Sequence, residues 1–263
     1  HETSFNEEAA IIKTLGGSLL FSSGEATFSS IDLINKEFKS SGNQQINLSK
    51  SYLKRHKIFR KQLLSTVSSL NKIKVCVIGD LIIDEYISCN ALGMSQEEPT
   101  LVVTPIDSKK FVGGAGIVAA HAAGCGANVK LISVVGKDDL GAYANQNLKM
   151  MGVESFFFED ERRPTTLKQR YRSGGKSLLR ISKLHQDPIS STLEKKIFSK
   201  IKKILSKCNL LIFSDFNYGC LTDNLIKKIT ELCKKNKIFM AADSQSSSQI
   251  GDISKFKDVD LMT

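Results

Sequence analysis

From residue 72 onward, short apolar runs alternate with segments of helical periodicity. Strands are expected where apolar and β-branched residues are contiguous, and helices where apolar residues recur every three to four positions. The predicted strands are 74–78, 130–135, 210–214 and 238–242, and the predicted helices are 116–124, 140–151, 191–207 and 223–236. This alternation predicts an α/β fold in which a mostly parallel sheet lies between helices.

Two further regions have strand character but interrupt that alternation. Residues 85–90 with 101–106, and 165–172 with 178–181, are extended segments. The residues Arg172-Ser173-Gly174-Gly175-Lys176 between the last two are typical of a hairpin turn. Four such strands predict a small accessory β-sheet outside the main one.

The segment before residue 72 is strongly basic. The chain has 37 Lys and Arg against 27 Asp and Glu, a net charge of +10. Residues 39–71 supply seven of those positive charges and no negative one, which leaves +3 for the rest. Apolar residues from Leu48 to Leu70 follow at helical spacing, so we expect a basic linker helix. Docking of this helix on the neighbouring domain is favoured over binding to anionic lipid or nucleic acid.

Composition excludes several classes of protein. The apolar runs last only a few residues, whereas a membrane-spanning helix needs about 20. The acidic opening of the chain does not fit a secretory signal, and no two of the six cysteines are spaced as in Cys-x-x-Cys. A cytoplasmic protein with reduced thiols, no metal site and no membrane partner is therefore expected. The later lysine pairs lack interleaved aromatic residues, which disfavours nucleic-acid binding.

Acidic residues follow three predicted strands. Asp80, Asp215 and Asp243 each come directly after an apolar run, and Asp84 follows four residues after Asp80. Each one alone is more typical of a helix cap. Because ligands of open parallel sheets bind beyond the carboxyl ends of the strands, the set together favours a polar cleft.

A glycine-rich stretch opens the helix at 116–124. Gly113-Gly114-Ala115-Gly116 is neither a Walker A loop nor a Gly-x-Gly-x-x-Gly motif. The paired glycines allow either a close approach of backbone to a ligand or tight packing of helix on sheet. Both interpretations stay open from the sequence alone.

In combination these motifs resemble the ribokinase-type (phosphofructokinase-B) sugar kinases. The resemblance rests on Gly79-Asp80-x-x-x-Asp84, on Gly113-Gly114-Ala-Gly-x-Val-Ala, and on Arg163-Pro-Thr-Thr-x-Lys168-x-Arg170. The longer run from Arg163 to Arg172, followed by Leu178-Leu179-Arg180, looks most similar to the heptose-7-phosphate kinase branch. Ser214-Asp215-Phe-Asn-Tyr-Gly219 and Asp243-Ser-Gln fit the same branch. The similarity runs through 72–263 in order, and it implies a ribokinase-like fold with the accessory sheet as a lid.

The resemblance implies roles for particular residues. Asp80 and Asp84 would hold sugar hydroxyls, and the backbone of Gly113 and Gly114 would line the same pocket. Asp215 and Asp243 would belong to a sugar or nucleotide cleft. Three cations of the lid would hold a substrate phosphate, with ion pairing on the lid surface as the alternative: Lys168, Arg170 and Arg180.

The implied reaction is transfer of the γ-phosphate of Mg-ATP to the anomeric hydroxyl of a heptose 7-phosphate. The product would enter a nucleotidyltransferase step toward an activated nucleotide-heptose for surface polysaccharide. Where many relatives have Asn, this chain has Ile117. Another sugar or sugar phosphate therefore remains an alternative substrate. Exposed edges of a lid sheet need covering, which predicts a homodimer through that sheet.

The first residues resemble a different family. Residues 1–38 look like the end of a cytidylyltransferase-type domain, in which Ser29 and Ser30 would meet nucleotide phosphates at a helix N-terminus; a plain helix cap is the alternative. The predicted division is therefore a tail at 1–38, a linker at 39–71 and a kinase part at 72–263.

The family's Pro-Asn-x-x-Glu and Gly-Ala-Gly-Asp motifs are absent from this sequence. We therefore expect a fragment whose C-terminal part is missing and whose general-base Asp lies beyond Thr263. Such a chain would not be catalytically competent alone. A non-catalytic sugar-binding or scaffold protein is the second interpretation.

Overall fold

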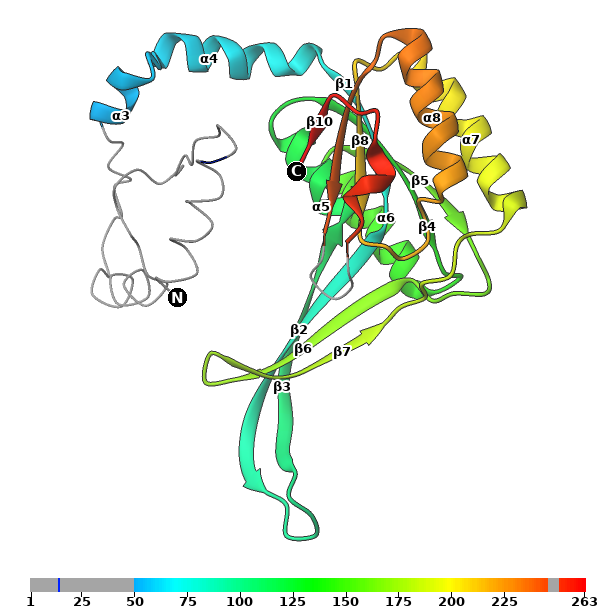
Figure 1. The fold of residues 1–263 in the computed structure, drawn as a ribbon. Helices are drawn as coiled ribbons and strands as arrows, with labels where there is room; N and C mark the ends of the chain where they lie inside the picture. Colours follow the sequence, from blue (N-terminus) through cyan, green and yellow to red (C-terminus); the bar gives the residue numbers. More distant parts are fainter. Residues whose placement is uncertain (1–13, 15–49, 246–250) are drawn as a thin grey trace. The chain divides into compact units, whose positions relative to one another are not determined.

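The computed structural model describes residue 14, residues 50–245 and residues 251–263 (Figure 1). The chain separates into two compact units, 1–58 and 59–263. The first unit contains helix α3 (Lys50–Arg55), and all elements described below belong to the second. Apart from Thr14, the predicted tail at 1–38 lies outside the described residues, and so do Ser29 and Ser30.

The basic linker contains two helices rather than the single predicted one. Helix α3 is followed by α4 (Arg60–Ser69) and the 3₁₀ turn η1 (Leu70–Lys72). Between α3 and α4, Lys57 has a left-handed φ of 51°, which a continuous helix does not allow. None of the residues of α4 is buried. Docking of the linker on the neighbouring domain stays a prediction.

The main sheet has six strands in the order β10-β9-β8-β1-β4-β5, and every neighbouring pair is parallel. The prediction of a mostly parallel sheet is confirmed. The strands are β1 (Lys74–Gly79), β4 (Asn128–Val135), β5 (Val153–Glu159), β8 (Leu210–Asp215), β9 (Phe239–Ser244) and β10 (Leu261–Met262). Strand β5 was not predicted, because its edge position leaves it half-buried and it carries Glu at both ends of a phenylalanine run.

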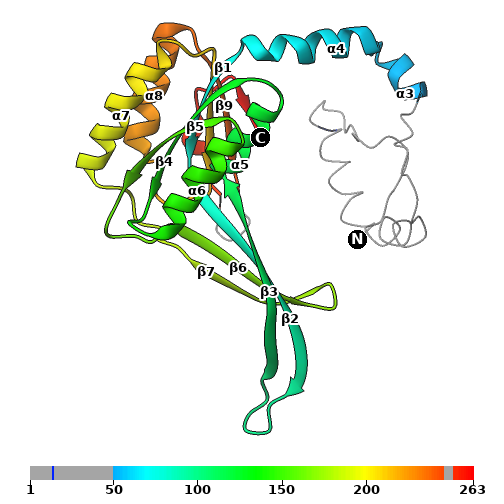
Figure 2. The same ribbon diagram turned by 180° about the vertical axis from the view of Figure 1, so that it is seen from behind.

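Two pairs of helices cover the two faces of this sheet (Figures 1 and 2). On one face lie α7 (Ser191–Leu205) and α8 (Asp223–Asn236), and on the other α5 (Ala115–Gly124) and α6 (Asp139–Met150). Three of the helices begin where a side-chain oxygen accepts a hydrogen bond from the first turn. The capping residues are Asp138, Ser190 and Thr222.

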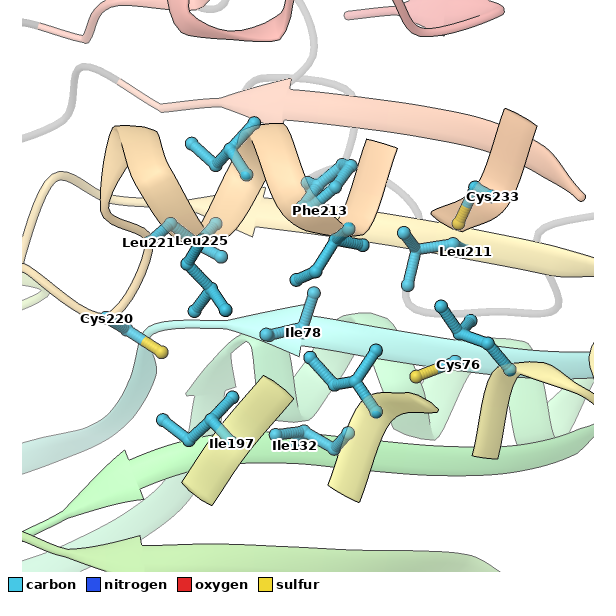
Figure 3. Close-up of a cluster of buried hydrophobic side chains, with 14 of the residues drawn as sticks. Cys76, Ile78, Ile132, Ile197, Leu211, Phe213, Cys220, Leu221, Leu225 and Cys233 are labelled. Carbon is cyan, nitrogen blue, oxygen red and sulfur yellow. The ribbon is translucent and has the colours of Figure 1, made fainter. Parts of the chain in front are cut away.

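The alternation of side chains along each strand divides the core into two clusters. In β1, Cys76 and Ile78 point toward α7 and α8, where they belong to the same cluster as Phe213 and Leu225 (Figure 3). The alternate residues Val75 and Val77 point toward α5 and α6. The central strands are therefore apolar on both faces, as parallel strands covered by helices must be.

A separate sheet of four strands, in the order β3-β2-β6-β7, extends from the main sheet and confirms the predicted accessory sheet. Its strands are β2 (Leu81–Met94), β3 (Leu101–Gly114), β6 (Thr166–Ser173) and β7 (Lys176–Lys183). The outer strand pairs are antiparallel, whereas β2 and β6 pair in parallel. The pairing of β2 with β6 ends at Ser88, so the distal part of β2 and β3 is a two-stranded ribbon (Figure 1).

Within the described ranges no helix is both long and apolar enough to cross a bilayer.

Close contact between β1 and β8 makes Gly79 intolerant of a side chain. A Cβ atom there would overlap the backbone carbonyl of Ser214, which cannot move without breaking the sheet. We expect Gly79→Ala to lower the free energy of unfolding by about 2 kcal/mol or more. The matched control is Gly124→Ala in α5, where nothing lies within 4 Å of the new methyl group. Equal urea-unfolding midpoints for the two variants would contradict this expectation.

Candidate functional site

A cavity of about 650 Å³ lies where the accessory sheet meets α5. Its inner end is formed by Gly113 and Ile117, and Asp84 lines it at the base of the accessory sheet. The remaining walls come from strands β2, β3 and β6. These lining residues are Tyr86, Ser88, Asp107, Lys109, Phe111, Val112 and Arg172.

Strand register explains why these side chains share one face. Along β2, alternate residues from Asp84 to Ser88 point to the same side. Their partners on β3 are Phe111, Lys109 and Asp107, and their partners on β6 are Lys168, Arg170 and Arg172. Arg180 pairs with Arg170 across the β6–β7 register. One face of the accessory sheet therefore collects five cationic side chains and two carboxylates.

The carboxylate of Asp84 is oriented by an ion pair. The Arg170 guanidinium donates to Asp84 Oδ1, and both side chains are about three-quarters buried. The same guanidinium lies 5.1 Å from the centroid of the Tyr86 ring, which in turn meets the Phe111 ring edge-on at 5.8 Å. Two aromatic rings and an arginine thus hold this carboxylate at the cavity wall.

The two glycines at the start of α5 allow close packing. A Cβ atom on Gly113 would overlap the Asp84 carboxylate, and one on Gly114 would overlap the Asp80 carbonyl. Gly114 also has a φ of +57°, which other residues rarely adopt. The packing interpretation is therefore confirmed, and only Gly113 also lines the cavity.

Asp80 lies between β1 and β2 and is buried outside the cavity. Its Oδ2 accepts hydrogen bonds from the backbone N–H groups of Phe216 at 2.8 Å and Tyr218 at 3.3 Å, and Oδ1 accepts from Cys220 at 3.2 Å. Burial raises the pKa of Asp80 to about 6, with a further increase from the nearby Asp215 charge, and the backbone donors partly oppose this. The carboxylate thus holds the loop 216–220.

Arg163 holds the same loop from the opposite side. It donates to the carbonyl groups of Tyr218 and Asp187, both at 2.9 Å, and pairs with Asp160 at 3.1 Å. The hydrogen bonds from Arg162, followed by those from Arg163, hold the pKa of Asp160 well below its usual range. This buried pair therefore stays ionised and fixes the chain just before β6.

Lys168 connects the accessory sheet to this loop. Its side chain is buried, and its ammonium group lies 5.6 Å from the Phe216 ring and 5.2 Å from the Tyr218 ring. Such cation–π contacts are strongest where water is excluded. Lys168 therefore packs at the junction of the two sheets.

The other predicted residues lie outside the cavity. Arg180 is exposed on β7. Asp215 is buried, with Lys255 Nζ at 3.5 Å, and Asp243 accepts from Gln245 and Thr263. Among the helices of the described residues, none is capped by the side chain of Asp80, Asp215 or Asp243. Of the predicted site residues that the structure describes, Asp84 and Gly113 line the cavity and the others do not.

Sequence analysis missed several cavity residues, including Tyr86, Lys109 and Arg172. The signal for Tyr86 was its place two residues after Asp84, which puts both on one strand face. The partners on β3 could not be found this way, because the register across the hairpin contains shifts at two positions. For metal binding, no group of three or more His, Cys, Asp or Glu side chains within the described ranges is arranged to hold an ion.

Two solved structures share the fold of this chain. A carbohydrate kinase from Agrobacterium tumefaciens matches 72% of the chain and 60% of its own length, with a TM-score of 0.53 and 16% identity. Arabidopsis thaliana ribokinase, solved with ribose and ATP, matches 72% of the chain and 59% of its own length, with a TM-score of 0.51 and 14% identity. At such identities the likeness establishes the fold, which is ribokinase-like.

The sequence comparison identifies the family. Residues 72–263 match the pfkB family carbohydrate kinases, and the chain belongs to this family of phosphotransferases. It is 31% identical over 205 residues to the bifunctional protein HldE of Geobacter metallireducens, and 31% identical over 191 residues to that of Helicobacter hepaticus. These matches cover 78% and 72% of the chain but only 41% and 39% of the relatives, so the chain spans about two-fifths of their length.

The raised pKa of Asp80 predicts a particular pH dependence of stability. The folded state binds a proton at Asp80 up to a pH of about 6, whereas the unfolded chain loses it near 3.8. The contribution of Asp80 to the free energy of unfolding is therefore fully present below about pH 4. It falls as the pH rises from about 4 through about 6. We expect the difference in unfolding free energy between wild type and Asp80→Asn to be larger at pH 5 than at pH 7.5. A difference independent of pH in urea titrations would contradict the assigned burial.

Proposed function

We propose that this chain is the sugar-binding part of an ATP-dependent kinase that phosphorylates the anomeric hydroxyl of a heptose 7-phosphate. The observation that carries the proposal is the cavity itself. It places a carboxylate and a glycine backbone at the inner end and cationic side chains on the lid face, in a chain similar to the HldE proteins. Polar hydroxyls and a phosphate on one small molecule would satisfy both ends.

At the inner end, Asp84 accepts hydrogen bonds from sugar hydroxyls, and the backbone of Gly113 approaches the ring. The ion pair with Arg170 keeps the Asp84 carboxylate in one orientation, so little ordering is needed when sugar binds. Asp80 supports this end by holding the neighbouring loop, and Gly114 by its close packing. Asp215 and Asp243, at the ends of β8 and β9, remain predicted cleft residues.

Mg-ATP is the proposed phosphoryl donor, since kinases of this family act on ATP. Positioning and charge neutralisation provide most of the catalysis in phosphoryl transfer. Residues of this chain contribute by binding and orienting the sugar and by excluding water under the lid. The predicted phosphate ligands Lys168, Arg170 and Arg180 contribute positive charge to the same sheet face.

One observation favours an alternative candidate substrate. Ile117 presents an apolar side chain at the inner end of the cavity, where an amide would bind a hydroxyl. A different sugar or sugar phosphate with fewer hydroxyls at that position would fit the same wall. In either case we propose a cytoplasmic enzyme whose product is consumed by a nucleotidyltransferase step toward surface polysaccharide.

Ligand-induced stabilisation tests the proposed substrate. Ligand at 100 times its Kd adds about 2.7 kcal/mol to the free energy of unfolding. We expect heptose 7-phosphate to raise the thermal midpoint of the 263-residue chain more than unphosphorylated heptose does. Asp84→Asn should weaken binding of both sugars about tenfold or more.

The control variant is Glu154→Gln, which removes a carboxylate that is ion-paired with Lys130 at 2.7 Å and does not line the cavity. Its response to both sugars should match that of the wild type. Equal responses of the wild type to the two sugars would refute the heptose 7-phosphate assignment.

We also propose that two copies of the chain associate through the lid sheet. In the distal ribbon of β2 and β3, the side chain of Leu92 is 66% exposed and that of Ile106 is 63% exposed. A two-stranded ribbon alone is marginally stable in water. We expect the double variant Leu92→Ser, Ile106→Ser to shift the chain from dimer to monomer in sedimentation velocity at micromolar concentration. Met150→Ser on α6, where Met150 is 71% exposed, should leave the dimer intact. A monomeric wild type would contradict the proposal.

A further inference from the structure

Two cations at the outer end of the cavity stand out because no carboxylate pairs with them. Among the ion pairs of the described residues, none includes Lys109 or Arg172, although both line the cavity. Arg172 donates one hydrogen bond, to the Gly175 carbonyl at 2.9 Å, and its guanidinium lies 6.0 Å from the Tyr86 ring. Most of its donors are therefore available to a ligand.

Other cations of the same sheet face are already engaged. Arg170 is bound to Asp84, and the ammonium group of Lys168 lies against two aromatic rings in the buried junction. Neither of them lines the cavity. We therefore regard Arg170 and Lys168 as positioning residues.

The strand register sets the distance between the two ends of the cavity. Lys109 is the β3 partner of Tyr86, and Arg172 is the β6 partner of Ser88. At about 3.3 Å per residue, these levels lie about 7 and 13 Å along β2 from Asp84. A ligand held at Asp84 by its hydroxyls would thus reach the two cations with its opposite end.

The net charge at this outer end is positive, although one carboxylate lies beside the two cations. Asp107 lines the same part of the cavity and is the β3 partner of Ser88. Two cations against one carboxylate leave a net charge of +1, which favours an anion. The carboxylate should weaken the binding of that anion through like-charge repulsion.

We propose that Lys109 and Arg172 bind the anionic group of a sugar substrate, at the end opposite to the hydroxyls held by Asp84. This assignment rests on the proposed function and adds to it the residues that distinguish a phosphorylated from an unphosphorylated sugar. Guanidinium and ammonium donors suit a phosphate because their hydrogen bonds to it are charge-assisted.

The test is calorimetric titration of the 263-residue chain with heptose 7-phosphate and with unphosphorylated heptose. We expect Lys109→Met and Arg172→Met each to weaken the phosphorylated sugar about tenfold or more, because each removes a charge-assisted hydrogen bond. Binding of the unphosphorylated sugar should change less than twofold. Asp107→Asn should act in the opposite direction and tighten the phosphorylated sugar.

Lys110→Met is the matched control. Lys110 neighbours Lys109 on the same strand, but it points to the other face, where it lies 3.8 Å from Glu85. Both lysines are exposed, so we expect all variants to keep the unfolding midpoint of the wild type without ligand. The control should retain the preference for the phosphorylated sugar.

The outcomes separate this inference from the proposed function. If the wild type prefers the phosphorylated sugar and the Lys109 and Arg172 variants keep that preference, the inference is wrong and the proposed function stands. Loss of the preference in Arg180→Met alone would move the phosphate to β7 and likewise overturn it. If the wild type shows no preference, the proposed function fails and the inference fails with it.

Discussion

The structure depends on the capture of backbone N–H groups by the buried carboxylate of Asp80. This residue lies between the last residue of β1 and the first of β2, and so it connects the main sheet to the accessory sheet. Its side chain accepts from the loop 216–220 after β8, and its carbonyl accepts from Ala115 at 2.9 Å, at the start of α5. One residue thereby ties together a strand junction, a loop and a helix. Burial of the charge is costly, and the three donors offset part of that cost.

The loop held by Asp80 also contacts the residues that position the accessory sheet. Arg163 binds the loop carbonyl of Tyr218 just before β6 begins, and Lys168 packs from β6 against the loop's aromatic rings. Because β6 pairs with β2, the orientation of the accessory sheet is set by contacts that are all buried at the junction. The cavity lies beside this junction, so its inner wall is rigid while its outer wall consists of exposed strand residues. If the proposed function holds, the sugar hydroxyls would meet the buried end and the anionic group the exposed end.

The two ends of the cavity differ in charge. The carboxylate at the inner end is neutralised by Arg170, whereas the outer end keeps two cations against one carboxylate. The chain belongs to the pfkB family of carbohydrate kinases, and the cavity proposed as its sugar site is lined by strands of the accessory sheet. The anion binding that we propose comes instead from Lys109 and Arg172, on two strands of the accessory sheet. Specificity of this kind can change without altering the fold, because exposed strand positions tolerate substitution.

Sequence alone determined the parallel sheet, its helices and the existence of an accessory sheet, because apolar periodicity directly reflects which faces are buried. The family resemblance also pointed to Asp84 and Gly113, and both line the cavity. Tertiary structure decided which charged residues meet. Lys109 reaches the cavity only through a hairpin register with two shifts, and Asp80 is withdrawn from it by amides more than 130 residues away. The edge strand β5 was missed for the same reason, since half-burial depends on a neighbour and not on local pattern. Contacts between distant segments follow from packing, and packing is not encoded in any short stretch of chain.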